Sequence, residues 1–339
     1  MLFKLLNYKI LFLIMLIMGT LITISSNSWV AMWLGLELNL LSFIPIMIMN
    51  KNILTSEASL KYFLVQTMAS SIFLISIIFS MINNESEFLN FLNFSEITFI
   101  VMNLKLGSAP LHYWFPSVME GLSWMNCFIL MTWQKIAPFS IISYLIPNFY
   151  IFSFFIITSI IIGAVGGLNH LSLRKIMAFS SINHLGWMIL SIMMSNSLWL
   201  IYFSTYTIIS LTILMIFFST FSDHFLQLVH SFKSSLQMKL MLMINLFSLG
   251  GLPPFLGFLP KWLVIQNSCY YNFLFLNFIL VSFNLITLFY YIRISLSSLL
   301  FYTSLPKMNF TILTPSILIP LLSSISMLGL LVYSLITLN

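Results

Sequence analysis

Charge is scarce in this sequence: of its 339 residues, 6% are Asp, Glu, Lys or Arg, whereas 60% are hydrophobic. A soluble globular domain carries about 25% charged residues, so the chain lacks the polar surface that would coat a water-soluble particle. Alternating strands of about ten residues, the pattern of a membrane β-barrel, are also missing. Apolar stretches of about 20 residues recur instead, each long enough to cross a bilayer core. The sequence therefore predicts an all-α integral membrane protein, because backbone in lipid must satisfy its own hydrogen bonds.

Cysteine is nearly absent, and the usual redox ligands do not cluster. The two cysteines, Cys127 and Cys269, form no CxxC pair, disulfide framework or iron–sulfur spacing. The histidines are scattered among helix ends and helix middles, with no facing pair that indicates haem ligation; they are His112, His170, His184, His224 and His230. We therefore predict no cofactor or redox centre in this chain. The net charge of +6 comes from basic residues scattered singly, which argues against nucleic-acid binding.

The apolar runs predict about eleven transmembrane helices in a single membrane domain. The first stretch has neither a small-residue cleavage site nor the Arg- and Ser-rich composition of a transit peptide, so we expect it to be a retained helix. Connectors are short except for polar stretches around 82–94 and 222–237. The expected helices lie near 4–24, 28–49, 57–81, 95–116, 123–145, 149–168, 174–193, 196–220, 238–268, 273–298 and 311–336.

Charge supports this count, because with eleven spans most basic residues fall on one side of the membrane. These residues are Lys4, Lys9, Lys51, Lys61, Arg174, Lys175, Lys233, Lys239, Arg293 and Lys307. The opposite side holds Glu85, Glu87 and Glu96 and no Lys or Arg. The positive-inside rule then places the N-terminus on the matrix or cytoplasmic side and the C-terminus on the opposite side.

Four charged residues lie inside predicted spans: Glu37, Lys105, Lys135 and Lys261. An ionised group at the bilayer centre costs about 3 kcal/mol or more unless protein or water solvates it. Snorkelling reaches only a turn or two, which is insufficient from mid-span. A structural ion pair could involve Glu37 and one lysine, but two lysines would stay unmatched. The set therefore favours a charge-moving or proton-moving function over a structural one.

Lysine suits a proton relay when it is buried near a carboxylate. Burial favours the neutral amine and a neighbouring carboxylate favours the ammonium, so a small change in surroundings can switch the proton. Movement of a proton off Glu37 could in this way control Lys105, and Lys135 and Lys261 would continue the path.

Two of the predicted helices carry helix breakers beside a lysine. Residues 103–116 read NLKLGSAPLHYWFP, and residues 248–262 read SLGGLPPFLGFLPKW. Proline removes a donor and clashes with the preceding turn. A simple kink remains an alternative for the first segment, whereas the second predicts broken helix, which membranes tolerate only where backbone faces protein or a water-filled cavity.

The two breaks lie five helices apart, which predicts two inverted five-helix repeats with discontinuous helices. A five-helix unit crosses the membrane an odd number of times, so its repeat enters from the opposite face. We expect the first repeat over 1–146, the second over 147–299 and a C-terminal helix over 300–339.

At these residues the chain resembles the chain 2 subunits of NADH–ubiquinone oxidoreductase from animal mitochondria, which are antiporter-like membrane subunits of respiratory complex I. The matching segments extend from about residue 20 to 295, and the last forty residues match only in hydrophobicity. They are WLGLELNLLSFIP, SEASLKYFLVQ, KLGSAPLHYWFPSVMEGL, TWQKIAP, SLRKIMAFSSINHLGWM and SLGGLPPFLGFLPKW.

The resemblance implies a role for each intramembrane charge. It implies that Glu37 and Lys105 form the glutamate–lysine pair of the first half-channel, that Lys135 is the connecting lysine, and that Lys261 serves the second half. His184 matches a histidine between the halves, and a packing role explains it equally well. The basic pair Arg174 and Lys175 matches a helix entrance, where anchoring of topology explains both.

The resemblance also implies a setting. FMN, iron–sulfur clusters and ubiquinone would be bound by other subunits, chains 4 and 4L would be neighbours, and membrane lipids such as cardiolipin would surround the chain. The location would be the mitochondrial inner membrane, with the N-terminus in the matrix and the C-terminus in the intermembrane space. Two alternatives stay open: a stand-alone cation/proton antiporter and a purely structural spacer of the membrane arm.

Overall fold

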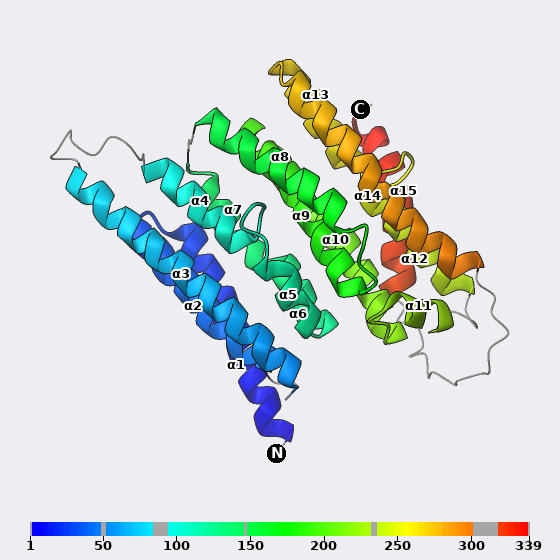
Figure 1. The fold of residues 1–339 in the computed structure, drawn as a ribbon, viewed down its shortest axis with the longest axis horizontal. Coiled ribbons are helices and arrows are strands. Elements are labelled where there is room, and N and C mark those ends of the chain that lie inside the picture. The colour runs from blue at the N-terminus through cyan, green and yellow to red at the C-terminus, as the bar shows by residue number, and fades with distance from the viewer. Residues whose placement is uncertain are drawn as a thin grey trace. The chain divides into compact units, whose positions relative to one another are not determined.

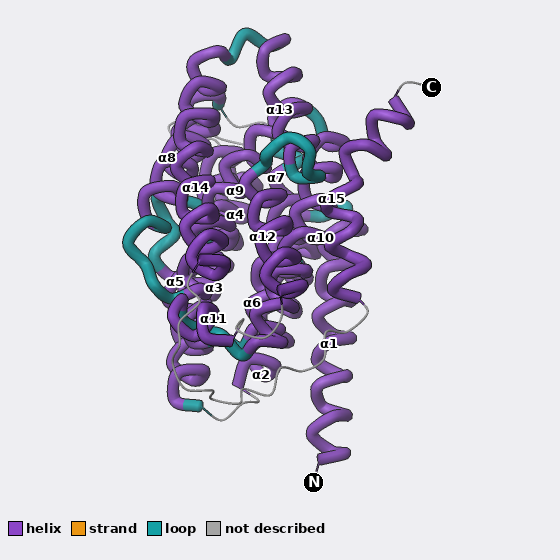
Figure 2. The backbone as a smooth tube through the Cα atoms, turned by 90° about the vertical axis from the view of Figure 1, so that its right-hand side faces the viewer, coloured by secondary structure: helices purple, strands orange, loops and turns teal. Residues whose placement is uncertain are grey.

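The computed structural model describes residues 2–48, 52–83, 94–145, 148–231, 236–300 and 318–337. The regular structure in these ranges is α-helical, apart from one isolated bridge between Ser172 and His224 (Figure 2). The chain divides into two compact units, Met1–Phe155 and Ile156–Asn339.

The first unit contains three long helices and four short ones (Figure 1). The long helices are apolar along most of their length, and the short ones are interrupted at polar or breaker residues. The elements are α1 (Leu2–Ser25), α2 (Trp29–Ile48), α3 (Ile53–Asn83), α4 (Phe94–Leu106), α5 (Trp114–Gly121), α6 (Trp124–Met131) and α7 (Trp133–Ile142).

The second unit is organised around α9, whose side chains from Ile176 to Ile192 are all buried. Helix α8 begins in the first unit and ends in the second. The elements are α8 (Phe149–Gly166), α9 (Leu173–Met194), α10 (Asn196–Thr220), α11 (Phe225–Ser231), α12 (Leu236–Gly250), α13 (Phe258–Tyr270), α14 (Leu274–Leu300) and α15 (Leu318–Thr337).

Seven described helices are long and apolar enough to cross a membrane: α1, α2, α3, α8, α9, α10 and α14. Their outward faces carry large apolar side chains, such as Leu64 and Met68 of α3, which are more than half exposed. Such faces suit lipid rather than water. The prediction of an all-helical membrane protein is therefore confirmed at this level.

Both predicted helix breaks are present. The segment expected as one span over 95–116 consists of α4 and α5, separated by residues 107–113. The segment over 238–268 consists of α12 and α13, separated by residues 251–257. The residue after each first half-helix is a glycine with positive φ, 73° at Gly107 and 81° at Gly251. Glycine adopts this left-handed geometry without a Cβ clash, so it ends each half-helix cleanly.

The span expected over 123–145 is also divided, which corrects the prediction of one continuous helix. Helices α6 and α7 meet at Thr132, whose backbone φ is −118°. The Thr132 hydroxyl donates to the Phe128 carbonyl at 2.7 Å, a back-bond that bends helices. Pro138 also removes a backbone donor from the first turns of α7. The Thr132 back-bond lies at the interruption itself, whereas Pro138 weakens α7 further along.

Some predicted features lie outside the described residues. They include most of the polar stretch at 82–94 with Glu85 and Glu87, the basic residues Lys51, Lys233 and Lys307, and the beginning of the helix expected at 311–336. The described part of that last helix is α15. The other polar connector, expected over 222–237, contains the short helix α11.

Candidate functional site

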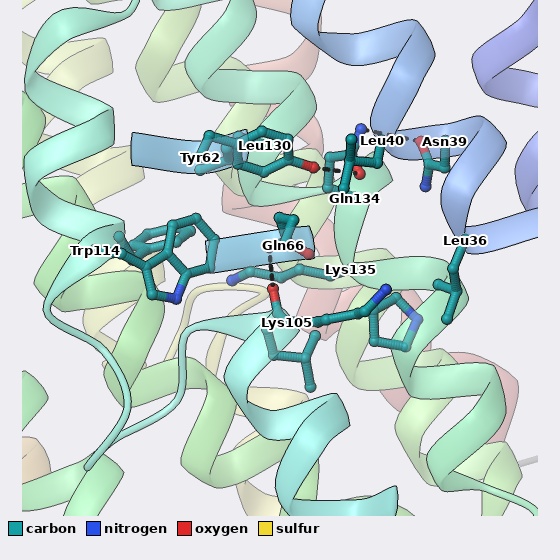
Figure 3. A pocket seen from close by; sticks show the side chains of 13 residues that line it. Leu36, Asn39, Leu40, Tyr62, Gln66, Lys105, Trp114, Leu130, Gln134 and Lys135 are labelled. Carbon is teal, nitrogen blue, oxygen red and sulfur yellow. Dashed lines mark hydrogen bonds between the residues drawn. The ribbon is translucent and has the colours of Figure 1, made fainter. Parts of the chain in front are cut away.

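A cavity of about 410 Å³, including its opening, lies in the first unit and contains two of the predicted lysines (Figure 3). Polar side chains from four helices face it, among apolar neighbours such as Leu36 and Leu130. Water occupies a cavity when it finds several polar partners there, and this lining offers amides, a phenol and amines. The lining residues are Leu36, Asn39, Leu40, Tyr62, Gln66, Lys105, Leu106, Trp114, Phe115, Leu130, Gln134, Lys135 and Pro138.

Lys105 stands in the last turn of α4, directly before the break. Its backbone carbonyl accepts a hydrogen bond from Gln66 Nε2 at 3.2 Å, and the Leu104 carbonyl accepts one from Trp114 Nε1 at 3.1 Å. Neutral side chains thus satisfy carbonyls that the helix end leaves open. The Lys105 side chain is 6% exposed and lines the cavity, where the C-terminal end of α4 favours a positive charge.

Glu37 lies on α2, half-buried, and its carboxylate interacts electrostatically with Lys105. In Figure 3 the Lys105 side chain extends toward Leu36, the neighbour of Glu37 in sequence. Among the described residues no salt bridge joins Glu37 to Lys105. The structure thus brings the two predicted groups into electrostatic range without locking them together.

Lys135 lies on α7 and is 1% exposed. Its Nζ atom is 5.7 Å from the centroid of the Phe115 ring, in cation–π range. Figure 3 shows the Lys135 side chain directed toward Trp114, opposite to the direction of Lys105. Both lysines thus line the same cavity, which the sequence did not specify.

A chain of amide and phenol groups crosses the same cavity, and the sequence gave no prediction for it. Tyr62 donates from its hydroxyl to Gln134 Oε1 at 3.3 Å, and Gln134 Nε2 donates to Asn39 Oδ1 at 3.0 Å. The bonds connect α3, α7 and α2. The sequence did place two of these groups near predicted charges, since Asn39 is two residues after Glu37 and Gln134 is next to Lys135.

Lys261 occupies the first turn of α13, in the second unit, and is 5% exposed. Its Nζ donates to the carbonyls of Leu249 and Gly250 at 3.2 and 2.9 Å, and to Asn284 Oδ1 at 2.7 Å. The two carbonyls belong to the C-terminal end of α12, where the helix dipole also favours a cation. The amine is also 5.8 Å from the Trp187 ring centroid.

His184 is buried in the middle of α9 and contacts two tyrosines of α10. Its Nδ1 lies 2.9 Å from the Tyr202 hydroxyl, and its ring centroid lies 5.1 Å from that of Tyr206. These side chains line a second cavity of about 230 Å³, together with Ser248 and Leu249 of α12. The i, i+4 spacing of the two tyrosines is visible in the sequence, but nothing there paired them with His184.

The basic pair at the start of α9 has an acidic partner. Arg174 forms a 2.5 Å ion pair with Asp223, which follows α10. The Asp223 carbonyl also accepts from the Leu173 N–H at 2.9 Å. This ion pair and the backbone hydrogen bond beside it, at the start of α9, fit the anchoring role expected of Arg174.

Metal-ligating side chains do not gather in the described ranges: no group of three or more His, Cys, Asp or Glu could hold an ion there. Cys127 is buried and Cys269 is exposed. The buried polar side chains of the two units are instead amines, amides, hydroxyls and the imidazoles of His112 and His184.

Comparison with known proteins identifies the family. The family described as "NADH:quinone oxidoreductase/Mrp antiporter, TM" matches residues 26–287. The chain is 56% identical to NADH-ubiquinone oxidoreductase chain 2 of Anopheles gambiae over 292 residues, covering 85% of this chain and 84% of the relative. It is 44% identical to the Locusta migratoria protein of the same name over 331 residues, covering 96% and 95%.

Solved structures share the fold. A chain of respiratory complex I from Thermus thermophilus matches with a TM-score of 0.80 at 19% identity, covering 96% of this chain and 79% of that one. A chain of the Mrp complex from Dietzia sp. matches with a TM-score of 0.71 at 15% identity, covering 84% and 59%. The chain therefore belongs to the family of NADH-ubiquinone oxidoreductase chain 2 proteins, the antiporter-like membrane subunits of complex I.

Proposed function

We propose that this subunit carries part of the proton path of complex I through Glu37, Lys105, Lys135 and Lys261, with His184 as a further participant. The observation that carries the proposal is the burial of three lysine residues among the helices, each at most 6% exposed. Buried ionisable groups at membrane depth mark ion pathways and proton relays. Electrons pass elsewhere: FMN, iron–sulfur clusters and ubiquinone belong to other subunits, and this chain contributes no redox centre.

In this proposal the first cavity works as a switchable proton site. Lys105 faces a space with room for water, and Glu37 acts on it through space without a fixed salt bridge. A proton arriving at or leaving the Glu37 carboxylate changes how strongly Lys105 holds its own proton. Lys135, which lines the same cavity, is the next acceptor, and Lys261 serves the second half.

The architecture that we propose for this path has eleven spans. Seven are the long helices, three are the divided pairs α4–α5, α6–α7 and α12–α13, and the last is α15. Two inverted repeats, over 1–146 and 147–299, would each contain one lysine-bearing break, followed by the C-terminal helix over 300–339. The common pattern of a lysine and a left-handed glycine at both breaks supports this assignment.

The setting follows from the family and from charge. We place the chain in the mitochondrial inner membrane, N-terminus in the matrix and C-terminus in the intermembrane space, by the positive-inside rule. Chains 4 and 4L of the same complex are the proposed neighbours, and lipids such as cardiolipin would cover the exposed apolar faces.

The test is the number of protons pumped per NADH oxidised by the assembled complex in sealed vesicles. Lys105→Met retains a long side chain but removes the protonatable amine, so we expect the ratio to fall while the complex still assembles. Lys61→Met is the matched control, because Lys61 lies on the exposed face of α3, ion-paired to Glu57.

An unchanged ratio in assembled Lys105→Met would overturn the relay and favour a structural spacer. Proton or cation exchange by the isolated chain in liposomes would instead favour the stand-alone antiporter.

A further inference from the structure

The break between α12 and α13 leaves backbone groups that need partners at membrane depth. Most described bonds there stay within the segment: Gly251 N–H donates to the Phe247 carbonyl and Phe255 N–H to the Leu252 carbonyl. The Leu249 and Gly250 carbonyls receive the Lys261 amine. One N–H of the segment, that of Leu256, donates a hydrogen bond to a residue far along the chain.

That acceptor is the backbone carbonyl of Ser326 in α15, 2.9 Å from the Leu256 nitrogen. The single proton of the Ser326 hydroxyl has two acceptors in range, both at 2.8 Å: Asn245 Oδ1 of α12 and the Ser323 carbonyl of its own helix. Ser326 and Asn245 are both fully buried, and Leu256 is nearly so. One residue of the last helix thus holds the chain on both sides of the break, at Asn245 before it and Leu256 after it.

Lys261 spans the same two sides. Its backbone belongs to α13, just after the break, and its amine bonds to carbonyls at the end of α12, just before it. The Leu256 carbonyl accepts from the Leu259 N–H at 3.2 Å, which links the residue held by α15 to the first turn of α13. The separation of α12 from α13 therefore determines whether the amine reaches its acceptors.

We propose that Ser326 is a positioning residue for Lys261, through its bonds to Asn245 and Leu256 on either side of the α12–α13 break. The inference rests on the proposed proton path, in which Lys261 takes part. It gives the last helix a task that its sequence does not reveal, since α15 is otherwise an apolar segment with scattered serines. A misplacement of about 1 Å is enough to impair a site that must exchange protons with fixed partners.

The experiment compares proton-to-NADH ratios of assembled complexes carrying Ser326→Ala, Ser326→Thr, Lys261→Gln or the control Ser324→Ala. Ser324 lies two residues away on α15, and its hydroxyl bonds only within its own helix turn, to the Leu321 carbonyl. Lys261→Gln keeps amide donors for the α12 carbonyls but loses the protonatable amine. Asn245→Leu removes the Ser326 bond from the other side and is assayed in parallel.

We expect Ser326→Ala and Asn245→Leu to lower the ratio, by less than Lys261→Gln does. Ser326→Thr keeps the hydroxyl, so we expect the ratio of the unsubstituted complex, and Ser324→Ala should leave the ratio unchanged. An unchanged ratio in Ser326→Ala, or an equal loss in Ser326→Thr, overturns the positioning role. So does failure of both Ser326→Ala and Asn245→Leu to assemble, because the contact would then serve folding alone. An unchanged ratio in Lys261→Gln is a different result, which overturns the participation of Lys261 itself.

Discussion

The two broken helices place a lysine in opposite ways. Lys105 precedes its break, and the carbonyls at the end of its half-helix are satisfied by neutral donors, Gln66 and Trp114. Lys261 follows its break and satisfies such carbonyls with its own amine. A similar pattern of lysine, glycine and proline thus builds two electrostatic sites: an amine facing a cavity, and an amine held by three acceptors.

The difference teaches how a buried charge is accommodated. Lys261 replaces its lost hydration with two carbonyls and the Asn284 amide oxygen, so its charge is solvated by protein. Lys105 has room for water and a carboxylate acting through space. The contacts of Lys261 fix the position of its amine, whereas the cavity beside Lys105 leaves its amine room to respond to Glu37.

The largest expected effect is a difference in stability between two matched substitutions. Lys261→Met removes the amine from three acceptors and leaves the buried Leu249 carbonyl without that donor, whereas the Gly250 carbonyl keeps Asn284 Nδ2 at 3.3 Å; an unsatisfied buried group costs about 1–3 kcal/mol. Lys105→Met removes an amine that faces the cavity, so we expect a smaller loss. The thermal inactivation midpoint of the assembled complex measures both. An equal decrease in the midpoint for the two substitutions would contradict the proposed difference between the Lys261 and Lys105 sites.

A second prediction concerns the neutral cap of the first break. Gln66→Leu leaves the Lys105 carbonyl without its donor, so we expect a loss of about 1–2 kcal/mol in unfolding free energy. The neighbouring Thr67→Val is the control, because its exposed hydroxyl bonds only to its own helix. Equal thermal midpoints for the two variants would show that the cap contributes nothing.

A third prediction uses the glycines that end the half-helices. Alanine at Gly107 or Gly251 would adopt a left-handed conformation, which costs about 1–2 kcal/mol. A Cβ at Gly251 would also lie 2.8 Å from Lys261 Cδ, whereas one at Gly107 would meet Phe115. Thermal midpoints should therefore fall for both, while pumping per NADH should fall more for Gly251→Ala. A larger loss of pumping per NADH in Gly107→Ala than in Gly251→Ala would contradict the placement of Lys261.

The smallest expected effect belongs to an ordinary exposed lysine. Lys61 and Glu57 form a helical ion pair at 2.6 Å with about half of each side chain exposed. Such pairs contribute about 0.3–0.5 kcal/mol. Lys61→Ala should thus shift the thermal midpoint barely at all, and a shift as large as that of Lys261→Met would show that burial does not separate the lysines.

The sequence predicted the membrane class, the break before Lys261 and the buried lysines, and it left a kink as an alternative after Lys105, because each of these depends on local composition. Long apolar runs need helices, and Gly107 or Gly251 beside prolines needs a break, whatever else surrounds them. The division of the expected helix over 123–145 was missed because Thr132, where α6 and α7 meet, is not a helix breaker by residue type, and only its backbone angles mark the break.

The partners of the charged groups could not be predicted, because they come from distant segments. Gln66 reaches Lys105 from another helix, and Asn284 and Ser326 act on the second break from far along the chain. Amides and hydroxyls of this kind occur throughout the sequence, so only the packed structure selects those that matter. The repeat boundaries and the membrane orientation stay predictions.

The most direct test of the contrast between the two lysines is a density map of the assembled complex that resolves water in both units. The account predicts ordered water within hydrogen-bond distance of Lys105 Nζ, in the cavity lined by Gln66 and Gln134, and a Lys261 amine bonded to the Leu249 and Gly250 carbonyls. A dry, closed space around Lys105, or a Lys261 amine surrounded by water and detached from those carbonyls, would contradict it.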